Sequence, residues 1–176
     1  MNFSILSLGS NIGNSKAILN KAFFFISQEP TIKCQKESQL YVTDPIGMKS
    51  ENKFTNSVLS IETNNNPYQL LKILEKIEKR LGKRIKQKND DRTIDIDIIF
   101  FNQQEFFSDE LIIPHPQWQK RLFVLFPLLE IYPKIKISKI DIFDVKEFIY
   151  KKFSKEDIGN FLNKQVFNEK NKNKKF

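Results

Sequence analysis

Residues 92–101 read Arg-Thr-Ile-Asp-Ile-Asp-Ile-Ile-Phe-Phe, so two carboxylates, Asp95 and Asp97, lie two positions apart inside an otherwise apolar run. β-Branched and aromatic residues favour strands, and successive side chains of a strand point to opposite faces. We therefore expect Asp95 and Asp97 to share one face, while Ile94, Ile96 and Ile98 pack against a core on the other. This alternation predicts a sheet with one sealed face and one face available for ligands.

The aspartate pair is a candidate metal site. Two like charges roughly 6 to 7 Å apart along a strand repel each other unless a positive group lies between them. A hard cation with oxygen ligands is the usual partner, and Mg²⁺ is the first candidate. The alternative is two solvated aspartates on the exposed face of an edge strand, and an isolated Asp-x-Asp does not decide between these interpretations.

The composition is that of a small single-domain protein. With 176 residues, 40% of them hydrophobic and 17 of them Phe, the chain can bury one substantial core. We expect one domain over residues 1–163 and a disordered, basic tail over residues 164–176. The chain shows no apolar stretch of membrane-spanning length and no signal-like start, so we expect a cytoplasmic protein without a membrane partner. The net charge of +8 suits nucleic acid or polyphosphate, but charge alone does not choose between them.

Hydrophobic periodicity predicts alternating strands and helices along the chain. Candidate strands cover residues 2–8, 32–43, 54–63 and 92–101. One candidate helix follows a Ser15 cap and stops before Pro30, and the other runs from Tyr68 to Gly82. The order β-α-β-β-α-β predicts an α+β fold of the ferredoxin-like kind, with helices packed mainly on one face of an antiparallel sheet.

Two further groups of residues are candidates for ligand binding. His115 lies between two prolines, and with Arg84, Arg92 and Arg121 it could form a ring of donors for a polyphosphate. The alternative is that these residues are scattered surface charges. Phe54 and Asn56 share a strand face and offer an aromatic plane and an amide, which suits a flat heterocycle. Phe123 is a candidate for the second side of an aromatic sandwich, although in a Phe-rich chain either ring could equally belong to the core.

Six short motifs in one order point to a known family. They are Leu8-Gly9-Ser10-Asn11, Tyr41-Val-Thr-Asp-Pro-Ile-Gly47, Phe54-Thr-Asn56, Glu78 ahead of Leu81-Gly82, Arg92-Thr-Ile-Asp-Ile-Asp-Ile98, and Pro114-His-Pro116 followed by Arg121-Leu-Phe123. In these motifs, from Leu8 to about Pro133, the chain resembles the 6-hydroxymethyl-7,8-dihydropterin pyrophosphokinases. These folate-pathway enzymes move a pyrophosphoryl group from ATP onto a pterin alcohol, and the family is a single small domain with a ferredoxin-like core.

The resemblance implies a role for each matching residue. Asp95 and Asp97 would hold two Mg²⁺ ions between the ATP phosphates and the attacking hydroxyl. With Arg92 and His115, the aspartates would make up the catalytic set. Residues implied to bind the pterin are Thr43, Asp44, Ile46, Phe54, Asn56 and Phe123. Residues implied to bind ATP are Glu78, Arg84, Arg92, Ile98, Leu111, His115 and Arg121. We expect a monomer whose partners are ATP and the pterin, with no nucleic acid.

The chain departs from the family pattern in the loop before the aspartate strand. Family members often carry Gly-Arg-x-Arg and Gly-Pro-Arg there, whereas this chain reads Gly82-Lys-Arg-Ile85 and Asp90-Asp-Arg92. The loop is expected to close over the substrates. Because the motif differs, the resemblance does not decide which of Lys83, Arg84, Lys86 and Lys88 contacts phosphate. Asp91 beside Arg92 adds a competing negative charge, and we expect a weaker or more mobile lid.

Two other functions compete with this interpretation. A ferredoxin-like RNA-binding module would use the same basic charge and exposed aromatics, but it gives no reason for paired aspartates, which repel a phosphate backbone. A pterin-binding relic without turnover would keep the fold and lose the chemistry. Retention of both aspartates with Arg92, His115 and Arg121 favours a working enzyme.

Overall fold

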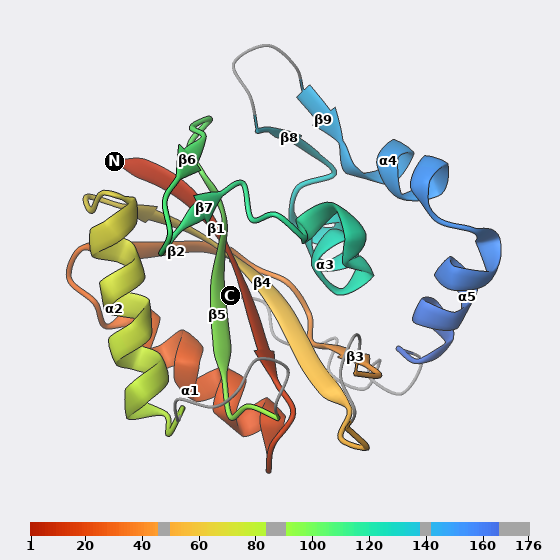
Figure 1. Cartoon of the computed structure of the whole chain (residues 1–176), viewed down its shortest axis with the longest axis horizontal. Helices are drawn as coiled ribbons and strands as arrows, with labels where there is room; N and C mark the ends of the chain where they lie inside the picture. The colour runs from red at the N-terminus through yellow and green to blue at the C-terminus, as the bar shows by residue number, and fades with distance from the viewer. Residues whose placement is uncertain (46–49, 84–90, 138–141, 166–176) are drawn as a thin grey trace.

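The computed structural model describes residues 1–45, 50–83, 91–137 and 142–165. Its centre is an antiparallel sheet of order β2-β4-β1-β5, with the short strand β3 paired to β4 (Figure 1). The elements of this part are β1 (Asn2–Ser10), α1 (Ser15–Ser27), β2 (Ile32–Glu37), β3 (Tyr41–Thr43), β4 (Phe54–Thr63), α2 (Pro67–Arg80) and β5 (Asp95–Phe101). The predicted α+β class is therefore confirmed.

Helices α1 and α2 cover one face of the sheet. Their apolar stripes are buried against the strand residues that point to that side, and the core residues include Leu6, Leu59, Leu74 and Ile96. The cap of α1 is Asn14, whose side chain accepts a hydrogen bond from the backbone N–H of Ala17, so the predicted Ser15 cap was wrong by one residue.

Helix α2 begins at Pro67 behind a capping box. The side chain of Asn66 accepts from the backbone N–H of Gln69, and the Gln69 side chain accepts from that of Asn66. Pro67 fits the first helical position because its missing N–H would have no partner inside the helix. The cap therefore places the start of α2 one residue before the predicted Tyr68.

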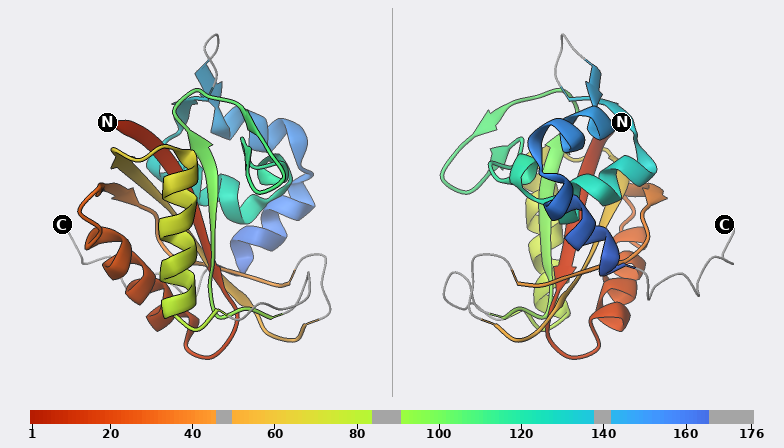
Figure 2. Two further views of the ribbon diagram at one scale, coloured as in Figure 1. Left: turned by 60° about the vertical axis from the view of Figure 1, so that its left-hand side comes forward. Right: turned by 90° about the vertical axis from the view of Figure 1, so that its right-hand side faces the viewer.

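The opposite face of the sheet also carries helices, over one end. This second layer was not predicted, because the sequence beyond Asn102 has no long periodic segment. Its elements are η1 (Trp118–Lys120), α3 (Leu122–Ile131), α4 (Val145–Lys152) and α5 (Lys155–Asn163). Trp118 contacts Phe100 of the sheet edge to face, and its ring also meets Phe143 and Phe148. Figure 2 shows the sheet lying between α1 and α2 on one side and α3 to α5 on the other.

The segment 32–43 forms two strands, not the single strand predicted. At the break, the Ser38 hydroxyl accepts a hydrogen bond from the backbone N–H of Val58, and the backbone N–H of Gln39 donates to Glu130 of α3. These bonds redirect the chain, so that β2 and β3 pair with different parts of β4. The aspartate strand likewise starts later than predicted, because β5 begins at Asp95.

Two small hairpins complete the described fold. They are formed by β6 (Phe106–Phe107) with β7 (Ile112–Ile113) and by β8 (Lys134–Lys136) with β9 (Ile142–Asp144). In the described ranges, no helix combines the length and the apolar character needed to cross a bilayer. Of the tail expected over residues 164–176, Lys164 and Gln165 are described and contact Asp44 and Val42, so the ordered chain runs at least two residues past the predicted boundary. The rest of the expected tail lies outside the described residues, which end at Gln165.

Candidate active site

The aspartates of β5 lie on the face opposite α1 and α2. In the β1–β5 register, Asp95 pairs with Gly9 and Asp97 pairs with Ser7. Ile94, Ile96 and Ile98 are buried in the core on the α1–α2 side. The two carboxylate side chains keep 25% and 32% of their surface exposed, so ligands can reach them. The alternation predicted from residues 92–101 is confirmed.

Two cations hold the carboxylate of Asp95. Lys83 Nζ lies 2.8 Å from Oδ1, and Arg92 Nη1 lies 2.7 Å from Oδ2. Burial opposes ionisation of this carboxyl, but the two cations outweigh burial and hold its pKa below the usual range. Asp95 is therefore a carboxylate over the whole physiological pH range.

Asp97 has weaker partners. Its Oδ2 lies 3.3 Å from Arg121 Nη1 and 3.7 Å from His115 Nε2. Burial and the charge of Asp95 raise the pKa of Asp97 to about 6, and Arg121 offsets only part of that rise. The repulsion between the two carboxylates, expected from the sequence, thus raises the pKa of Asp97, while the pKa of Asp95 stays low.

Glu78 is linked to Asp95 through Lys83. Its Oε1 accepts from Lys83 Nζ at 2.8 Å and from the backbone N–H of Ile96 at 2.7 Å. Burial raises the pKa of Glu78 to about 7 although Lys83 opposes this. The Lys83 bridge between two carboxylates was not foreseen, because residues 78, 83 and 95 are brought together only by the packing of α2 on β5.

His115 points toward Asp97 as a neutral ring. Burial and the nearby Arg121 charge lower the pKa of His115 to about 4. Its Nδ1 accepts a hydrogen bond from the backbone N–H of Gln117, which assigns the proton to Nε2, the nitrogen that faces Asp97. His115 is thus a neutral ring with an Nε2–H available to a ligand, not a fourth cation.

Asn11 anchors the start of the aspartate strand. Its Oδ1 accepts from the backbone N–H of Arg92, and its Nδ2 donates to Asp91 Oδ1 at 2.6 Å. The other oxygen of Asp91 accepts from Asn52. Asp91 therefore joins three segments, a structural role that the sequence did not suggest. Of the expected lid, residues 84–90 lie outside the described residues, and so does the candidate Arg84.

A row of residues leads across the sheet from β3 to the aspartates. Asn56 pairs with Gly9 on the neighbouring strand, and Gly9 pairs in turn with Asp95. The Asn56 amide donates to the Thr43 hydroxyl at 3.0 Å. A Cβ on Gly9 would lie 3.0 Å from Asn56 Oδ1 and 3.9 Å from a Phe54 ring carbon. Gly9 therefore leaves room beside Asn56 on the face that carries Asp95.

The remaining candidates are spread around this row. Phe54 is half-buried on β4, and Phe123 is half-buried at the start of α3 with the Arg121 guanidinium 5.6 Å from its ring centroid. Asp44 pairs with Lys164, while Ile46 lies outside the described residues. The side chains of Ile98 and Leu111 are buried in the α1–α2 core, so any contact of these residues with a ligand would be made mainly by their backbone atoms.

The two carboxylates suit a hard cation whose remaining ligands are substrate phosphates and water. Asp95 and Asp97 supply carboxylate oxygens on one strand face. In the described part of the chain, no three His, Cys, Asp or Glu side chains are grouped so that they could hold a metal ion by themselves. Mg²⁺ commonly binds through one or two carboxylates, with substrate phosphates and water as its other ligands. The residues present therefore fit Mg²⁺ bound together with a phosphate substrate.

Comparison with known proteins identifies the family. The family described as 7,8-dihydro-6-hydroxymethylpterin-pyrophosphokinase (HPPK) matches residues 5–133. The chain belongs to this family. The HPPK match spans every motif described above and ends two residues after α3.

Individual HPPK relatives agree with this assignment. A 2-amino-4-hydroxy-6-hydroxymethyldihydropteridine pyrophosphokinase of Bacillus subtilis is 37% identical over 135 residues, which cover 77% of this chain and 81% of the relative. The enzyme of the same name from Pseudomonas aeruginosa is 32% identical over 132 residues, covering 75% and 82%.

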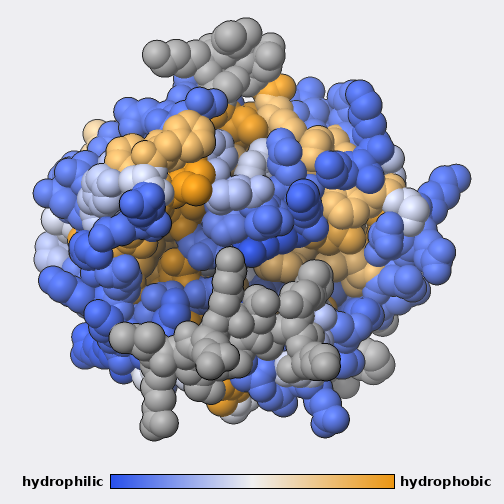
Figure 3. Space-filling view, viewed as in Figure 1, coloured by the Kyte–Doolittle hydropathy of each residue, from blue (hydrophilic) through white to orange (hydrophobic). Residues whose placement is uncertain are grey.

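A solved structure supports the fold. The crystal structure of Plasmodium falciparum HPPK-DHPS wild type with STZ-DHP matches with a TM-score of 0.71 at 17% identity. The alignment covers 94% of this chain and 46% of the Plasmodium chain, so the present chain spans less than half of that longer protein. In Figure 3, hydrophobic surface lies both at the upper left, on the side of β6 and β7, and toward the helices on the right, with hydrophilic surface between the two.

Proposed function

We propose that Asp95 and Asp97 hold two Mg²⁺ ions for the reaction of the HPPK family. That reaction transfers the pyrophosphoryl group of ATP to 6-hydroxymethyl-7,8-dihydropterin in folate biosynthesis. The observation that carries the proposal is the acidic face of β5, where two carboxylates meet Lys83, Arg92 and Arg121 within 3.3 Å. Bound Mg²⁺ would neutralise phosphate charge and make the pterin hydroxyl more acidic.

The cations of the site are placed to bind the triphosphate. Lys83, Arg92 and Arg121 come from three different segments and converge on the two aspartates. Guanidinium and ammonium groups that pair with carboxylates can also pair with phosphate oxygens, which have similar geometry and charge. His115 adds a neutral donor beside Asp97. Positioning and charge neutralisation are the main demands of phosphoryl transfer, and these groups supply both.

The pterin would lie on the row that runs from β3 to Asp95. Asn56 and Thr43 present hydrogen-bonding groups at one end of the row, and Gly9 leaves space between Asn56 and the aspartate strand. Phe54 and Phe123 are the candidates for stacking on the ring system, as the resemblance implies. A pterin held in this row would direct its hydroxymethyl group toward Asp95.

Further parts of the proposal concern the molecule as a whole. The strand order β2-β4-β1-β5, antiparallel throughout, supports the ferredoxin-like βαββαβ arrangement with β3 as a short addition. We also propose one domain, predicted over residues 1–163 and extended to Gln165 by the contacts of Lys164 and Gln165 with Asp44 and Val42. We propose in addition that the chain is a monomer and, because ATP is the co-substrate, that it is cytoplasmic. Light scattering after size exclusion tests the monomer, which a mass of twice 20.8 kDa would contradict.

The decisive assay measures AMP formed from ATP and 6-hydroxymethyl-7,8-dihydropterin in the presence of Mg²⁺. Asp95→Ala and Asp97→Ala should abolish AMP formation, whereas Asp109→Ala, which removes an exposed carboxylate elsewhere, should leave it intact. ADP in place of AMP would mean a different kinase. No turnover by the unmodified chain, combined with tight pterin binding, would indicate a pterin-binding protein that has lost catalytic activity.

A further inference from the structure

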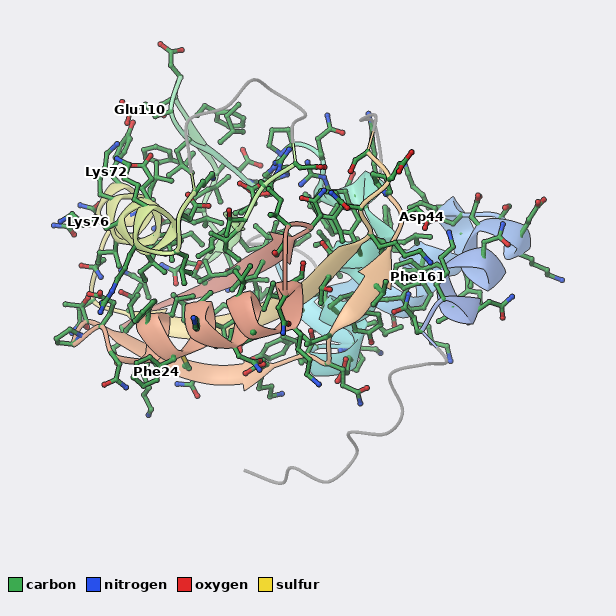
Figure 4. All side chains as sticks on the ribbon, turned by 90° about the horizontal axis from the view of Figure 1, so that it is seen from below. Phe24, Asp44, Lys72, Lys76, Glu110 and Phe161 are labelled. Carbon is green, nitrogen blue, oxygen red and sulfur yellow. The ribbon has the colours of Figure 1, made fainter. Side chains whose placement is uncertain are left out.

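The C-terminal helix α5 packs against the strand that carries Thr43. Helix α5 lies beyond residues 5–133, the part that matches the HPPK family, yet its Phe161 ring stacks on Tyr41 of β3. The same ring stacks on Phe126 of α3 with its centroid 4.8 Å away. Figure 4 shows Phe161 and Asp44 close together where α5 meets the end of β3. Residues outside the family match therefore contact the strand that carries Thr43 of the proposed pterin site.

Gln165, just after α5, completes the open edge of β3. Among the described strands, β3 pairs with β4 alone, and the backbone N–H and C=O of Val42 are directed to the other side. Gln165 Oε1 accepts from the Val42 N–H at 2.8 Å, and Gln165 Nε2 donates to the Val42 C=O at 2.7 Å. Its Nε2 also donates to the carbonyl of Phe161 at 2.9 Å, which ties the side chain to α5. One carboxamide thus replaces a missing neighbour strand.

The neighbouring residues of β3 are held in the same way. Lys164 forms an ion pair with Asp44, and Phe161 covers Tyr41. Thr43 lies between these contacts, and its hydroxyl accepts the Asn56 amide on the site face of the sheet. A strand of three residues with a single neighbour is weakly held by its own ladder, so the α5 contacts add much of its order.

We infer that Gln165 and Phe161 are positioning residues that set β3, and through it Thr43 and Asn56, for pterin binding. The inference rests on the proposed pterin role of Thr43 and Asn56. A site whose hydrogen-bonding groups are already ordered binds more tightly, because less ordering is required when the ligand arrives. The ATP end of the site is held by Lys83, Arg92 and Arg121, none of which these α5 contacts touch.

The test compares Gln165→Ala and Gln165→Glu with the unmodified chain. Alanine removes the two hydrogen bonds to Val42 and the one to the Phe161 carbonyl, whereas glutamate keeps the size and the acceptor but places a carboxylate against the Val42 carbonyl. Each variant should raise the KM for the pterin by about fivefold, the factor that corresponds to one typical hydrogen bond, and leave the KM for ATP within about twofold. Amide hydrogen exchange of Val42 should become faster without any ligand present.

Leu162→Ala is the matched control, because Leu162 lies on the same helix but is 40% exposed. It should leave both KM values and the exchange of Val42 unchanged. An unchanged pterin KM in both Gln165 variants, in a chain that forms AMP normally, would overturn the inference while the proposed function stands. If the unmodified chain forms no AMP with the pterin, the proposed function fails and the inference fails with it.

Discussion

The two faces of the sheet differ in how far they are covered. On one face, α1 and α2 bury a continuous set of strand residues that runs from Leu8 and Ile96 to Ile61 and Phe101. On the other face, α3 to α5 cover only the end that carries Ile5, Val58 and Phe100. Beyond these residues the same face carries Ser7, Gly9, Asn56 and the two aspartates. The α1–α2 layer therefore supplies most of the buried core, and the α3–α5 layer leaves the part of the sheet with the candidate site uncovered.

The comparison shows how a single strand serves both purposes. In β5, isoleucines pack into the sealed face while the aspartates between them meet cations on the open face. Burial of a carboxylate is costly unless it is paired, and burial of an isoleucine is favourable. Substitutions on the two faces should thus separate activity from stability.

The largest effect is expected on the open face. Asp95→Asn or Asp97→Asn should lower turnover at least about a thousandfold, because a bound metal stabilises the transition state by several kcal/mol.

The two variants should differ in stability. Asp97→Asn should not lower the free energy of unfolding at pH 8, since it removes a carboxylate whose ionised form burial and Asp95 disfavour. Asp95→Asn should lower the free energy of unfolding, because the ion pairs of Asp95 with Lys83 and Arg92 are lost. Turnover and denaturant unfolding on the same samples check both statements, and equal stability changes would contradict the contrast.

A substitution on the sealed face should act in the opposite way. Leu74→Ala should lower the free energy of unfolding by about 3 kcal/mol, because Leu74 is buried in the α1–α2 core and the cavity cannot fully close. The turnover number of the folded fraction should stay near that of the unmodified chain. Ile112→Ala is the control, because Ile112 is 40% exposed and should change neither quantity much. A loss of turnover without a loss of stability in Leu74→Ala would break the comparison.

Glu78 lies between the two regions and should make stability depend on pH. Its pKa of about 7 in the folded chain is above the ordinary 4.5, so folding takes up a proton between these values. The contribution of Glu78 to stability should therefore fall as the pH rises through this window, beside the separate contributions of Asp97 and His115. Glu78→Gln should remove the Glu78 contribution, so the variant should gain stability relative to the unmodified chain above pH 7, by no more than about 3 kcal/mol, with no such gain below pH 4.5. Denaturant unfolding from pH 4 to 8 tests this, and parallel profiles for the two proteins would refute it.

The smallest effect is expected at Gly9. Gly9→Ala places a Cβ 3.0 Å from the Asn56 amide oxygen, and Asn56 is also held by Thr43. We expect about a tenfold weaker affinity for the pterin, with ATP affinity unchanged, since a shift of Asn56 costs roughly one good hydrogen bond. Gly159→Ala is the control, because a Cβ there meets nothing within 4 Å and alanine favours the helix. Calorimetric titration of both variants measures the difference, and equal pterin affinities would remove Gly9 from the site.

Several features of the site could be read from the sequence because they depend on local geometry. The shared face of Asp95 and Asp97 follows from strand alternation, and the helices follow from their apolar periodicity. The boundaries were less accurate: Asn14 caps α1 in place of Ser15, and Ser38 with Gln39 divides one expected strand into two. Asn and Ser cap helices almost equally well, so composition could not choose between them.

Other features required the tertiary structure because they depend on distances between remote residues. The Lys83 bridge from Glu78 to Asp95, the neutral state of His115 and the Gln165 contacts with Val42 join segments that no motif connects. The sequence by itself determined that two carboxylates share one face of a strand and that the chain resembles the HPPK family. Only the packing decided that Asp95 is held ionised while the pKa of Asp97 is raised, because that difference depends on which cations the folded chain places beside each oxygen.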